Sequence, residues 1–357
     1  MSLRVLNVAF PFAPVGPSGV GGAERIVAEL DGALVDAGYG SMVLACEGSE
    51  VRGELIPVRA PRYPTLDDAT QNEIRRRMQA ALDAALASRE IDLIHMHGVD
   101  FHRYRVAPGI PVLVTLHLPI AWYPREAWSF RKPVRFCCVS QSQRKSCPPE
   151  LGDIAVIENG VPLFPLDGTR TRENFALVLG RICPEKNAHE ALEAGSRAGV
   201  SVWLAGQVFP YREHQQYFAE KIKPLLGPQQ SGVQHRFLGP LSRERLRSLL
   251  ARARCLLHPT RAPETSSLVA MEAMAAGTPV IAYPSGALKE IVSHGVTGYL
   301  VHSVDEMAQA IQSVHLISRQ ACRAAAANRF SIDRMIASYL DLYRSLVRAS
   351  SAEHAHA

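Results

Sequence analysis

The chain has 357 residues and a mass of 39.0 kDa, more than one ordinary hydrophobic core accommodates, so its length predicts two domains. Hydrophobic residues make up 47% and charged residues 20% of the sequence, which is typical of globular proteins and excludes a disordered or fibrous chain. The formal net charge of +5 is carried mainly by dispersed arginines, so no nucleic-acid-binding surface is expected.

Several sequence patterns indicate the cellular compartment in which the protein is expected. No run of about 18 apolar residues occurs, and the first residues, MSLRVLNVAFPFAP, lack the apolar core of a signal peptide. The seven cysteines include no C-x-x-C and no disulfide-like spacing, so we expect a cytoplasmic protein. The run Arg75-Arg76-Arg77 could contact an anionic membrane surface, but we favour a solvated helix face.

In chain order, short β-rich runs alternate with helical patterns, which predicts parallel sheets covered by helices. The first half begins with an apolar strand at 3–10, a glycine-rich loop and a helix at 23–38. Its further strands are expected at 41–46, 91–97, 111–117, 135–140 and 155–162. The polar, turn-rich segment 163–174 suits a linker between domains.

A second series of the same kind starts with a strand at 175–182 and ends in an amphipathic helix at 330–349. The strands between them are expected at 200–206, 233–239, 253–259, 278–283 and 297–301. We therefore predict an α/β protein made of two similar halves with one cleft between them. In such sheets ligands bind beyond the carboxyl ends of the strands.

One such strand end is followed by a candidate anion site. Glu264 lies in the loop after the strand at 253–259, and Ser266 and Ser267 are favourable N-cap residues for the apolar helix that follows. The first free backbone N–H groups of this helix, including those of Ser267 and Leu268, would bind a phosphate.

Two carboxylates would flank this anion site. Glu264 and Glu272 are separated by seven residues, and Glu272 lies ~7–8 Å along the helix at ~1.5 Å per residue. Carboxylates are good acceptors for paired hydroxyls such as those of a ribose or a hexose. Taken singly, Glu264 is equally compatible with a salt bridge in a loop, and Glu272 with a charge pair on a helix.

The segment HPTRAPETSSLVAMEAMAAGTPVIAYPSGALKEIVSHGVTGYLV, residues 258–301, resembles the donor-site signature of the retaining glycosyltransferases of family 4. The E-x7-E spacing and the EAMAAGTPVIA block carry the resemblance. It implies that Glu264 contacts hydroxyls of the donor sugar or the surroundings of its phosphate, and that Glu272 binds the ribose hydroxyls. The family usually has an aromatic residue and then Gly or Ser after the first Glu, whereas this chain has Thr265-Ser266-Ser267. The family's sugar preference therefore does not carry over.

The loop GRICPEKN, residues 180–187, places Arg181 and Lys186 five residues apart. Two convergent cations would stabilise the charge of a departing nucleoside diphosphate, although an ordinary charged surface loop has the same composition. The loop also resembles the family's diphosphate-binding motif G-R-x-x-x-x-K-N. No Asp-x-Asp occurs in the chain, so we expect the two cations to replace the Mg²⁺ or Mn²⁺ of metal-dependent transferases, with no other cofactor.

The glycine-rich turn PVGPSGVGGAER, residues 14–25, follows the first strand. Gly19-x-Gly21 would open a dinucleotide-binding fingerprint, but Glu24 stands where the third glycine belongs. The sequence GGAE instead resembles the N-terminal motif of the same family. This implies that Gly21 and Gly22 bring the backbone close to the donor diphosphate or to the acceptor.

Three histidines fall near strand ends in the first half. His95 and His97 share one strand face, which would suit a metal site, but further ligands are not near in sequence and we favour a hydrogen-bonded role in the cleft wall. His117 matches the family's histidine that approaches the donor sugar from the reaction face, where it orients and supports the substrate electrostatically. The aromatic segment 122–128 could stack on a carbohydrate acceptor or close a small core.

The family implies the GT-B fold, which has two Rossmann-like domains, with the donor bound mainly to the second. The first domain would comprise residues 1–164 and the returning helix at about 333–349, and the second residues 170–330. We therefore predict a retaining glycosyltransferase that moves a sugar from a nucleoside diphosphate, with uridine the commonest base in the family. The acceptor would be a hydroxyl of a small molecule, a glycan or a lipid-linked compound.

Two other functions share this pattern, namely a sugar-nucleotide 2-epimerase of the same fold and a degenerate protein that only binds a sugar nucleotide or glycan. The chain also has a general likeness, carried by no motif, to transferases of actinomycete oligosaccharide-antibiotic pathways such as that of avilamycin.

Overall fold

The computed structural model describes residues 3–17, 19, 21–59, 67–106, 108–130, 133–163, 172–228 and 232–355, without the side chains of 353–355. The chain forms two compact units, Met1–Asn159 with Asp333–Ala357, and Gly160–Ile332. The linker expected at 163–174 falls largely outside the described residues. Across the described ranges, no helix is both long and apolar enough to cross a membrane.

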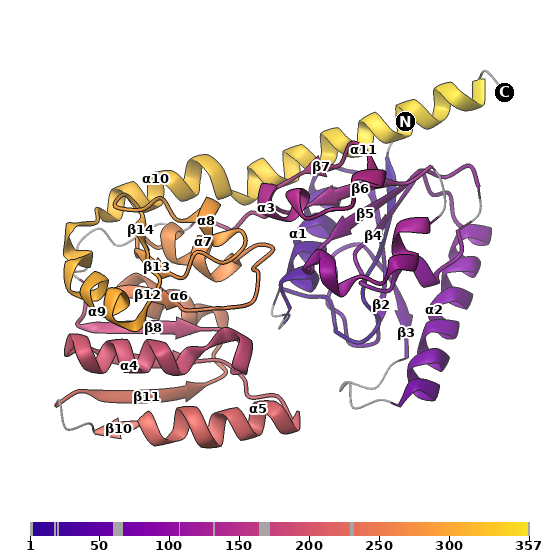
Figure 1. Cartoon of the computed structure of the whole chain (residues 1–357). Coiled ribbons are helices and arrows are strands. Elements are labelled where there is room, and N and C mark those ends of the chain that lie inside the picture. The colour runs from indigo at the N-terminus through magenta and orange to yellow at the C-terminus, as the bar shows by residue number, and fades with distance from the viewer. Residues whose placement is uncertain are drawn as a thin grey trace. The chain divides into compact units, whose positions relative to one another are not determined.

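The first unit is built on a seven-stranded parallel sheet with the order β3-β2-β1-β4-β5-β6-β7 (Figure 1). Its strands are β1 (Arg4–Val8), β2 (Gly40–Cys46), β3 (Glu54–Val58), β4 (Leu93–Met96), β5 (Val112–Leu116), β6 (Arg135–Cys138) and β7 (Ala155–Val156). Its α-helices are α1 (Gly22–Asp36), α2 (Asp68–Ser88), α3 (Gln141–Lys145) and α11 (Ile332–Ala355).

Both faces of this sheet are buried, which explains why its strands read as continuous apolar runs. Leu6 and Val8 of β1 belong to the same core cluster as Met78 of α2. On the opposite face Val43 of β2 packs in a cluster with Val27 of α1. Because successive strand residues point to opposite faces, the apolar sequence of β1 and β2 supplies both layers at once.

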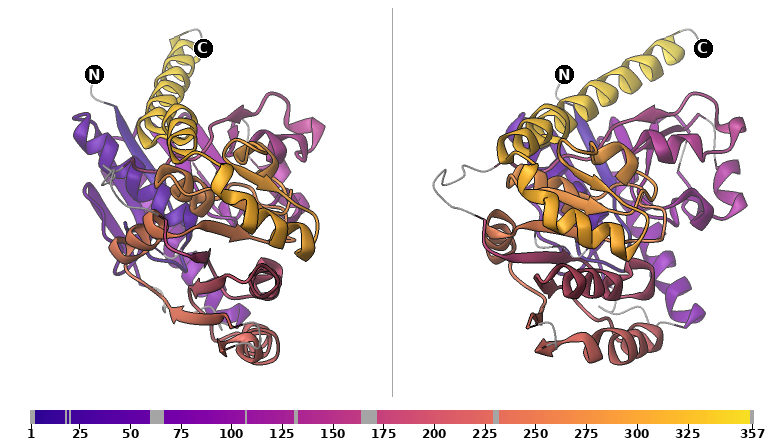
Figure 2. Two further views of the ribbon diagram at one scale, coloured as in Figure 1. Left: turned by 90° about the vertical axis from the view of Figure 1, so that its left-hand side faces the viewer. Right: turned by 60° about the vertical axis from the view of Figure 1, so that its left-hand side comes forward.

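The final helix of the chain begins two residues later than predicted. The pattern at 330–349 suggested one helix, but α10 ends at Phe330 and α11 starts at Ile332 and continues to Ala355. The break is a short bridge between Ser331 and Val161. Figure 2 shows α11, in yellow, as one uninterrupted helix from two sides.

The second unit also contains a seven-stranded sheet, with the order β10-β11-β9-β8-β12-β13-β14. All its pairs are parallel except β10 with β11. Its strands are β8 (Phe175–Leu179), β9 (Ser201–Ala205), β10 (Gly227–Pro228), β11 (Gln234–Gly239), β12 (Cys255–His258), β13 (Val280–Ala282) and β14 (Gly298–Leu300). Its α-helices are α4 (Ala188–Ala198), α5 (Arg212–Tyr217), α6 (Arg243–Arg252), α7 (Leu268–Ala275), α8 (Leu288–Ile291), α9 (Val304–Ser313) and α10 (Arg319–Phe330).

Helices cover both faces of this second sheet. Along β8, Leu177 joins a core cluster that contains residues of α6, α7 and α10, while its neighbour Val178 joins a cluster with residues of α4 and α9. The unit is thus a doubly wound α/β sheet, and its loops beyond the carboxyl ends of β8 and β12 are where a ligand site is expected.

Strands β3 and β10 are absent from the sequence prediction. Strand β3 reads ELIPV and lies at the sheet edge, where Pro57 interrupts the alternation of apolar residues without removing a needed hydrogen bond. Strand β10 has only two residues, one of them Pro228, and its pairing depends on the neighbouring β11. Neither segment carries a pattern of its own that would identify it as a strand.

Candidate functional site

In the second unit, an ion pair joins two loops beyond the sheet. Lys186 ends the 3₁₀ turn Pro184–Lys186 after β8, and its Nζ pairs with the carboxylate of Glu264 in the loop after β12. The side chains of Lys186 and Glu264 keep 23% and 11% of their surface exposed, so the pair is shielded yet accessible. Burial favours a raised pKa for Glu264, but Lys186 and then His258 lower that pKa below its ordinary value. Glu264 is therefore ionised at neutral pH.

Backbone and side-chain hydrogen bonds hold these two loops together. The carbonyl of Glu185 accepts from Thr260 Oγ1 and from the backbone N–H of Arg261, both at 3.1 Å. Asn187, which adopts a left-handed backbone with φ of 57°, donates from Nδ2 to the carbonyl of Pro259 at 3.1 Å. The ion pair is thus set in a cross-linked frame.

Gly286, in the loop after β13, fixes the backbone of Glu264. The N–H of Ala287 donates to the Glu264 carbonyl at 2.7 Å. A Cβ at position 286 would lie 2.2 Å from that oxygen, and the φ of Gly286 is +56°. Only glycine permits this approach, which explains the loop sequence PSG.

The start of α7 offers hydrogen-bond donors beside this pair. Ser267 Oγ lies 3.1 Å from His258 Nε2 and does not cap the helix. Ser266 Oγ is buried and has no hydrogen-bond partner among the described residues. The helix begins at Leu268, and the first backbone N–H groups of any helix lack an intrahelical acceptor. These groups together suit an anionic ligand.

The remaining predicted donor-site residues occupy defined places in the same unit. Glu272 is the fifth residue of α7 and is half-buried. Arg181, just after β8, is exposed, and its Nη2 lies 3.8 Å from Glu185 Oε1. Each of the two predicted cations therefore faces a carboxylate. His258, beside Glu264, is uncharged at neutral pH because burial lowers its pKa to about 4.

In the first unit, His95 is the centre of a buried and uncharged network. Its Nδ1 lies 2.7 Å from the hydroxyl of Tyr343, and its Nε2 lies 2.7 Å from Thr115 Oγ1. Thr115 also contacts the Tyr339 hydroxyl at 3.3 Å. Burial lowers the pKa of His95 well below its ordinary value. Both ring nitrogens of His95 therefore have hydrogen-bond partners.

His97 and His117 form a second, connected pair. His97 Nδ1 lies 3.0 Å from His117 Nε2, and His97 Nε2 lies 3.2 Å from Asn7 Oδ1. Burial lowers the pKa of His117 to about 4, so its ring is uncharged at neutral pH. The structure therefore supports the hydrogen-bonded role expected for His97.

Gln143 holds the segment that carries His117, and the sequence analysis missed it. Its Nε2 donates to the carbonyls of Leu116 at 2.7 Å and Leu118 at 2.9 Å, on either side of His117. Its Oε1 accepts from the N–H of Val139 at 2.8 Å. The signal was the pattern Ser-x-x-Gln from Ser140, which is typical of a helix start, and Ser140 does cap α3.

The glycine-rich turn before α1 makes room for a carboxyl group. A Cβ on Gly21 would lie 1.8 Å from Glu24 Oε2, so a larger residue there would require the Glu24 side chain to move. Glu24 is buried; this burial raises its pKa, and a hydrogen bond from its own backbone N–H lowers it in part. Gly22 is the first residue of α1. These positions belong to the first unit.

The aromatic segment at 122–128 divides between core and surface. Tyr123 is buried, and Trp128 packs against it and Phe136 with ring centroids 5.6 and 6.2 Å apart. Trp122 is 52% exposed. The segment therefore closes a small core and leaves the Trp122 indole at the surface.

The arginine run on α2 is paired with carboxylates of its own unit. Arg75 Nε lies 3.3 Å from Asp100 Oδ2, and Arg76 and Arg77 both pair with Glu73, at 2.7 and 2.9 Å. Arg76 and Arg77 are exposed, as expected for a solvated helix face, whereas Arg75 is half-buried against Asp100.

Within the second unit, the structure thus groups Lys186 and Glu264 with His258, Ser267 and the start of α7. Arg181 lies on the same strand-end loop as Lys186, and Glu272 lies further along α7. The candidate residues His117, Gly21 and Gly22 belong to the first unit. The grouped residues combine an ion pair, neutral hydrogen-bond donors and a helix N-terminus, which suits a ligand with both anionic and hydroxyl groups.

Comparisons with known proteins agree with this chemistry. Residues 20–163 match the family described as Glycosyltransferase Family 4, and residues 166–329 match Glycosyl transferases group 1. The glycogen synthase of Mycobacterium tuberculosis is 26% identical over 367 residues, which cover 87% of this chain and 86% of that protein.

Two solved structures share the fold over nearly all of both chains. AviGT4, a glycosyltransferase involved in avilamycin A biosynthesis, has a TM-score of 0.69 and 22% identity, and the match covers 97% of this chain and 98% of AviGT4. Anabaena Alr3699/HepE, solved with UDP and glucose, has a TM-score of 0.72 and 19% identity, with 96% and 100% covered. The predicted α/β GT-B fold is confirmed, and the chain is a glycosyltransferase of this fold.

Proposed function

We propose that this protein transfers a sugar from a UDP-sugar to a hydroxyl acceptor with retention of the anomeric configuration, and without Mg²⁺ or Mn²⁺ on the diphosphate. The observation that carries the proposal is the Lys186–Glu264 pair, set beside the start of α7. The complex of Anabaena Alr3699/HepE with UDP and glucose supports the choice of UDP on this fold. The seven free cysteines support a cytoplasmic location.

The donor would bind by replacing contacts that the protein now makes with itself. Arg181 and Lys186 each face a carboxylate, and a diphosphate would compete for both cations. The first N–H groups of α7 would supply neutral donors to its phosphate oxygens, as would the Ser266 hydroxyl, which has no partner within the described ranges. Glu272 would accept from the ribose hydroxyls. Such cations also stabilise the negative charge that grows on the leaving UDP.

The state of Glu264 supports a reaction without a carboxylate base. Its lowered pKa and its pair with Lys186 make it a weak proton acceptor. In the proposed step, the bond from the anomeric carbon to the UDP oxygen breaks, and a bond to the acceptor oxygen forms on the same face. The acceptor proton passes to the departing phosphate. Glu264 would then orient the sugar hydroxyls.

His117 would act in this scheme as a neutral group. Its ring is uncharged at neutral pH, and its Nε2 is engaged by His97. We assign it the orientation of the donor sugar, with its backbone fixed by Gln143.

Thermal unfolding with UDP, GDP, ADP, dTDP and CDP tests the donor assignment. Each nucleotide is added with EDTA and, separately, with Mg²⁺. A ligand at ~100-fold its Kd stabilises by ~2.7 kcal/mol, which is readily measured as a raised midpoint. We expect UDP with EDTA to raise the midpoint. A response only with Mg²⁺ would contradict metal independence, and no response to any nucleotide would contradict the donor site.

Turnover then tests the reaction. UDP-sugars are incubated with small alcohols, oligosaccharides and lipid-linked sugars, including oligosaccharide-antibiotic precursors because of the likeness to AviGT4. Proton NMR of the product should show the anomeric configuration of the donor. An epimerised nucleotide sugar without acceptor would indicate a 2-epimerase, and binding without turnover across the panel would indicate a degenerate binder.

A further inference from the structure

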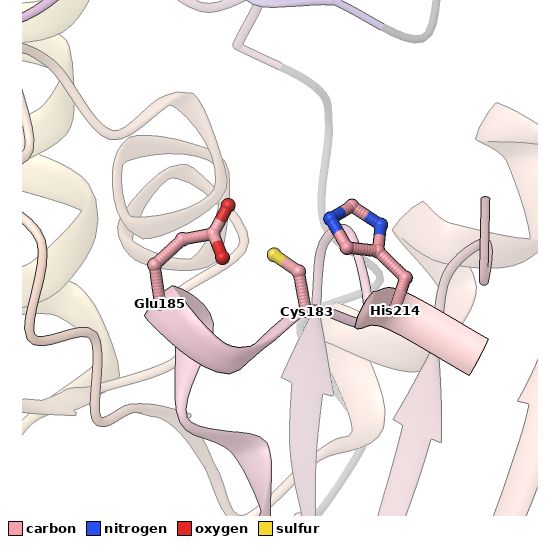
Figure 3. A group of neighbouring side chains, drawn as sticks. All are labelled: Cys183, Glu185 and His214. Carbon is pink, nitrogen blue, oxygen red and sulfur yellow. The ribbon is translucent and has the colours of Figure 1, made fainter. Parts of the chain in front are cut away.

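A separate cluster of metal-ligand side chains lies in the second unit. Cys183, Glu185 and His214 place one ligand atom each within 4.8 Å of the others. Cys183 and His214 are buried and Glu185 is half-buried. Figure 3 shows the Cys183 sulfur between the Glu185 carboxylate and the His214 ring, which turns a nitrogen towards the sulfur. None of the three belongs to the donor-binding residues proposed above.

Two different elements bring these side chains together. Cys183 precedes the 3₁₀ turn Pro184–Lys186 and Glu185 lies on it, so the loop after β8 supplies two of the groups. His214 comes from α5, and its ring packs edge-on against Tyr211 with centroids 5.0 Å apart. The hydrogen bonds from Thr260 and Arg261 to the Glu185 carbonyl fix the turn. The cluster is therefore held from both sides.

The combination of a thiol, an imidazole and a carboxylate matches zinc better than magnesium. Thiolate and imidazole bind thiophilic or borderline cations, whereas Mg²⁺ requires oxygen ligands. Tetrahedral zinc bonds of ~2.0–2.3 Å place the ligand atoms ~3.3–3.7 Å apart, so the cluster needs to contract by no more than ~1.5 Å. Rotation of the half-buried Glu185 side chain and a small shift of α5 would provide this.

We propose that Cys183, Glu185 and His214 bind one thiophilic divalent cation, with Zn²⁺ as the expected ion. The bound ion would join α5 to the loop between β8 and α4. Three protein ligands leave a fourth position for water or another small ligand. Arg181, 3.8 Å from Glu185, competes with the ion for that carboxylate, so occupancy would release Arg181 from this pair. Metal binding here does not rest on the sugar-transfer proposal, whose metal independence concerns only ions on the diphosphate.

Cobalt titration of the untagged full-length protein tests the site directly. After removal of metal with a chelator, Co²⁺ is added and the sulfur-to-cobalt charge-transfer absorption is recorded. We expect one equivalent to bind and to be displaced by Zn²⁺ but not by Mg²⁺. Cys183→Ser should abolish the absorption, and Glu185→Gln and His214→Gln should each weaken binding ~10-fold or more.

Cys322→Ser is the matched control, because Cys322 is also a buried thiol of this unit but lies outside the cluster. It should bind cobalt as the unaltered protein does. Circular dichroism of each metal-free variant checks that it folds. If Cys183→Ser does not fold, the cobalt affinity of Glu185→Gln tests the proposal instead, because Glu185 is only half-buried and its substitution should be tolerated. The proposal is overturned if the unaltered protein binds no cobalt. It is equally overturned if Glu185→Gln and His214→Gln bind as tightly as the unaltered protein.

Discussion

In the first unit, an uncharged network lies at β4 and β5, where His95 is bonded to Thr115 and Tyr343. Beyond the carboxyl ends of strands in the second sheet, Lys186 and Glu264 form an ion pair. Both sheets have the same doubly wound design, so the fold does not determine this difference. In the charged loop, a ligand phosphate can replace the Glu264 carboxylate as the partner of Lys186. The neutral network has no cation to bind a doubly charged anion, but its hydrogen-bonding groups suit hydroxyl groups. The comparison thus agrees with our proposal that the second unit binds the diphosphate.

The largest effect is expected from a substitution in the ion pair of the second unit. Lys186→Ala should lower kcat at least ~100-fold, because one donor to a developing negative charge is lost. It should also destabilise the protein by ~2 kcal/mol, because Glu264 is left mostly buried without its partner. Steady-state kinetics and thermal unfolding measure the two effects.

A second variant separates these two effects of Lys186. The double variant Lys186→Ala, Glu264→Gln removes the unpaired charge, so it should regain stability but not turnover. Lys289→Ala, at an exposed position, is the control and should match the unaltered protein. Full turnover in Lys186→Ala would break the assignment of the diphosphate.

The second effect concerns how the charged loop is fixed. Gly286→Ala should destabilise by ~3 kcal/mol, because its Cβ meets the Glu264 backbone at 2.2 Å and its φ is positive. Gly295→Ala also has a positive φ, +76°, but meets no atom within 4 Å, so it should lose only ~1 kcal/mol. Urea unfolding compares the two. Equal losses of stability in the two variants would show that the close approach of Gly286 to Glu264 does not add to the cost of the substitution.

Acidification tests the neutral side of the comparison. Burial lowers the pKa of His117 to about 4, against ~6.5 in the unfolded chain, so its contribution to stability is complete above pH 6.5 and is lost as the pH falls towards 4. Between pH 7 and 5 the loss from His117 alone is ~2 kcal/mol. His95 and His97, whose pKa values are also lowered, add in the same direction.

Hydrogen exchange measured by mass spectrometry can report this acid effect separately in each unit. Peptides from β4 and β5 should lose more protection at pH 5 than peptides from β8 and β9, after correction for intrinsic exchange rates. Three histidines with lowered pKa values, His95, His97 and His117, lie on or directly after β4 and β5, whereas two histidines with lowered pKa values, His258 and His235, lie on the strands that pair with β8 and β9. The reverse order would show that the neutral network is not the acid-sensitive part of the protein.

A smaller effect is expected where a neutral side chain fixes the His117 segment. Gln143→Ala leaves the carbonyls of Leu116 and Leu118 without this donor and should cost ~1–2 kcal/mol. Lys145→Ala, at an exposed position on the same helix, should cost almost nothing. Thermal unfolding compares the two, and equal stabilities would contradict the role of Gln143.

The smallest expected change in stability is at Ser266. Its hydroxyl is buried and has no hydrogen-bond partner in the part of the chain that the structure describes, so Ser266→Ala should leave stability unchanged or raise it by less than ~1 kcal/mol. The affinity for UDP should nevertheless fall ~10-fold, since a donor to the phosphate is lost. Calorimetric titration measures the affinity. Ser285→Ala, which removes a hydroxyl bonded to the Ala262 carbonyl, should instead lower stability. An unchanged affinity for UDP in Ser266→Ala would contradict the proposed contact between Ser266 and the phosphate.

Much of the fold could be predicted because each central strand is buried on both faces and reads as an apolar run, as β1 and β8 do. The edge strand β3 was missed because its proline and exposed residues carry no such pattern. In the site, Glu264 and Lys186 were predicted, but their mutual pairing depends on loops 78 residues apart in sequence. Gln143 and the approach of Gly286 to Glu264 were missed, since both are tertiary contacts.

The path of the chain has a consequence for its synthesis. The second unit is one continuous segment, Gly160–Ile332, whereas the first needs Tyr339 and Tyr343 of α11 to complete the bonds to Thr115 and His95. Domains usually fold as they leave the ribosome, in order from the N-terminus. Here the order is inverted. The first unit can complete its core only after α11 has left the ribosome, and by then the whole of the second unit is already able to fold.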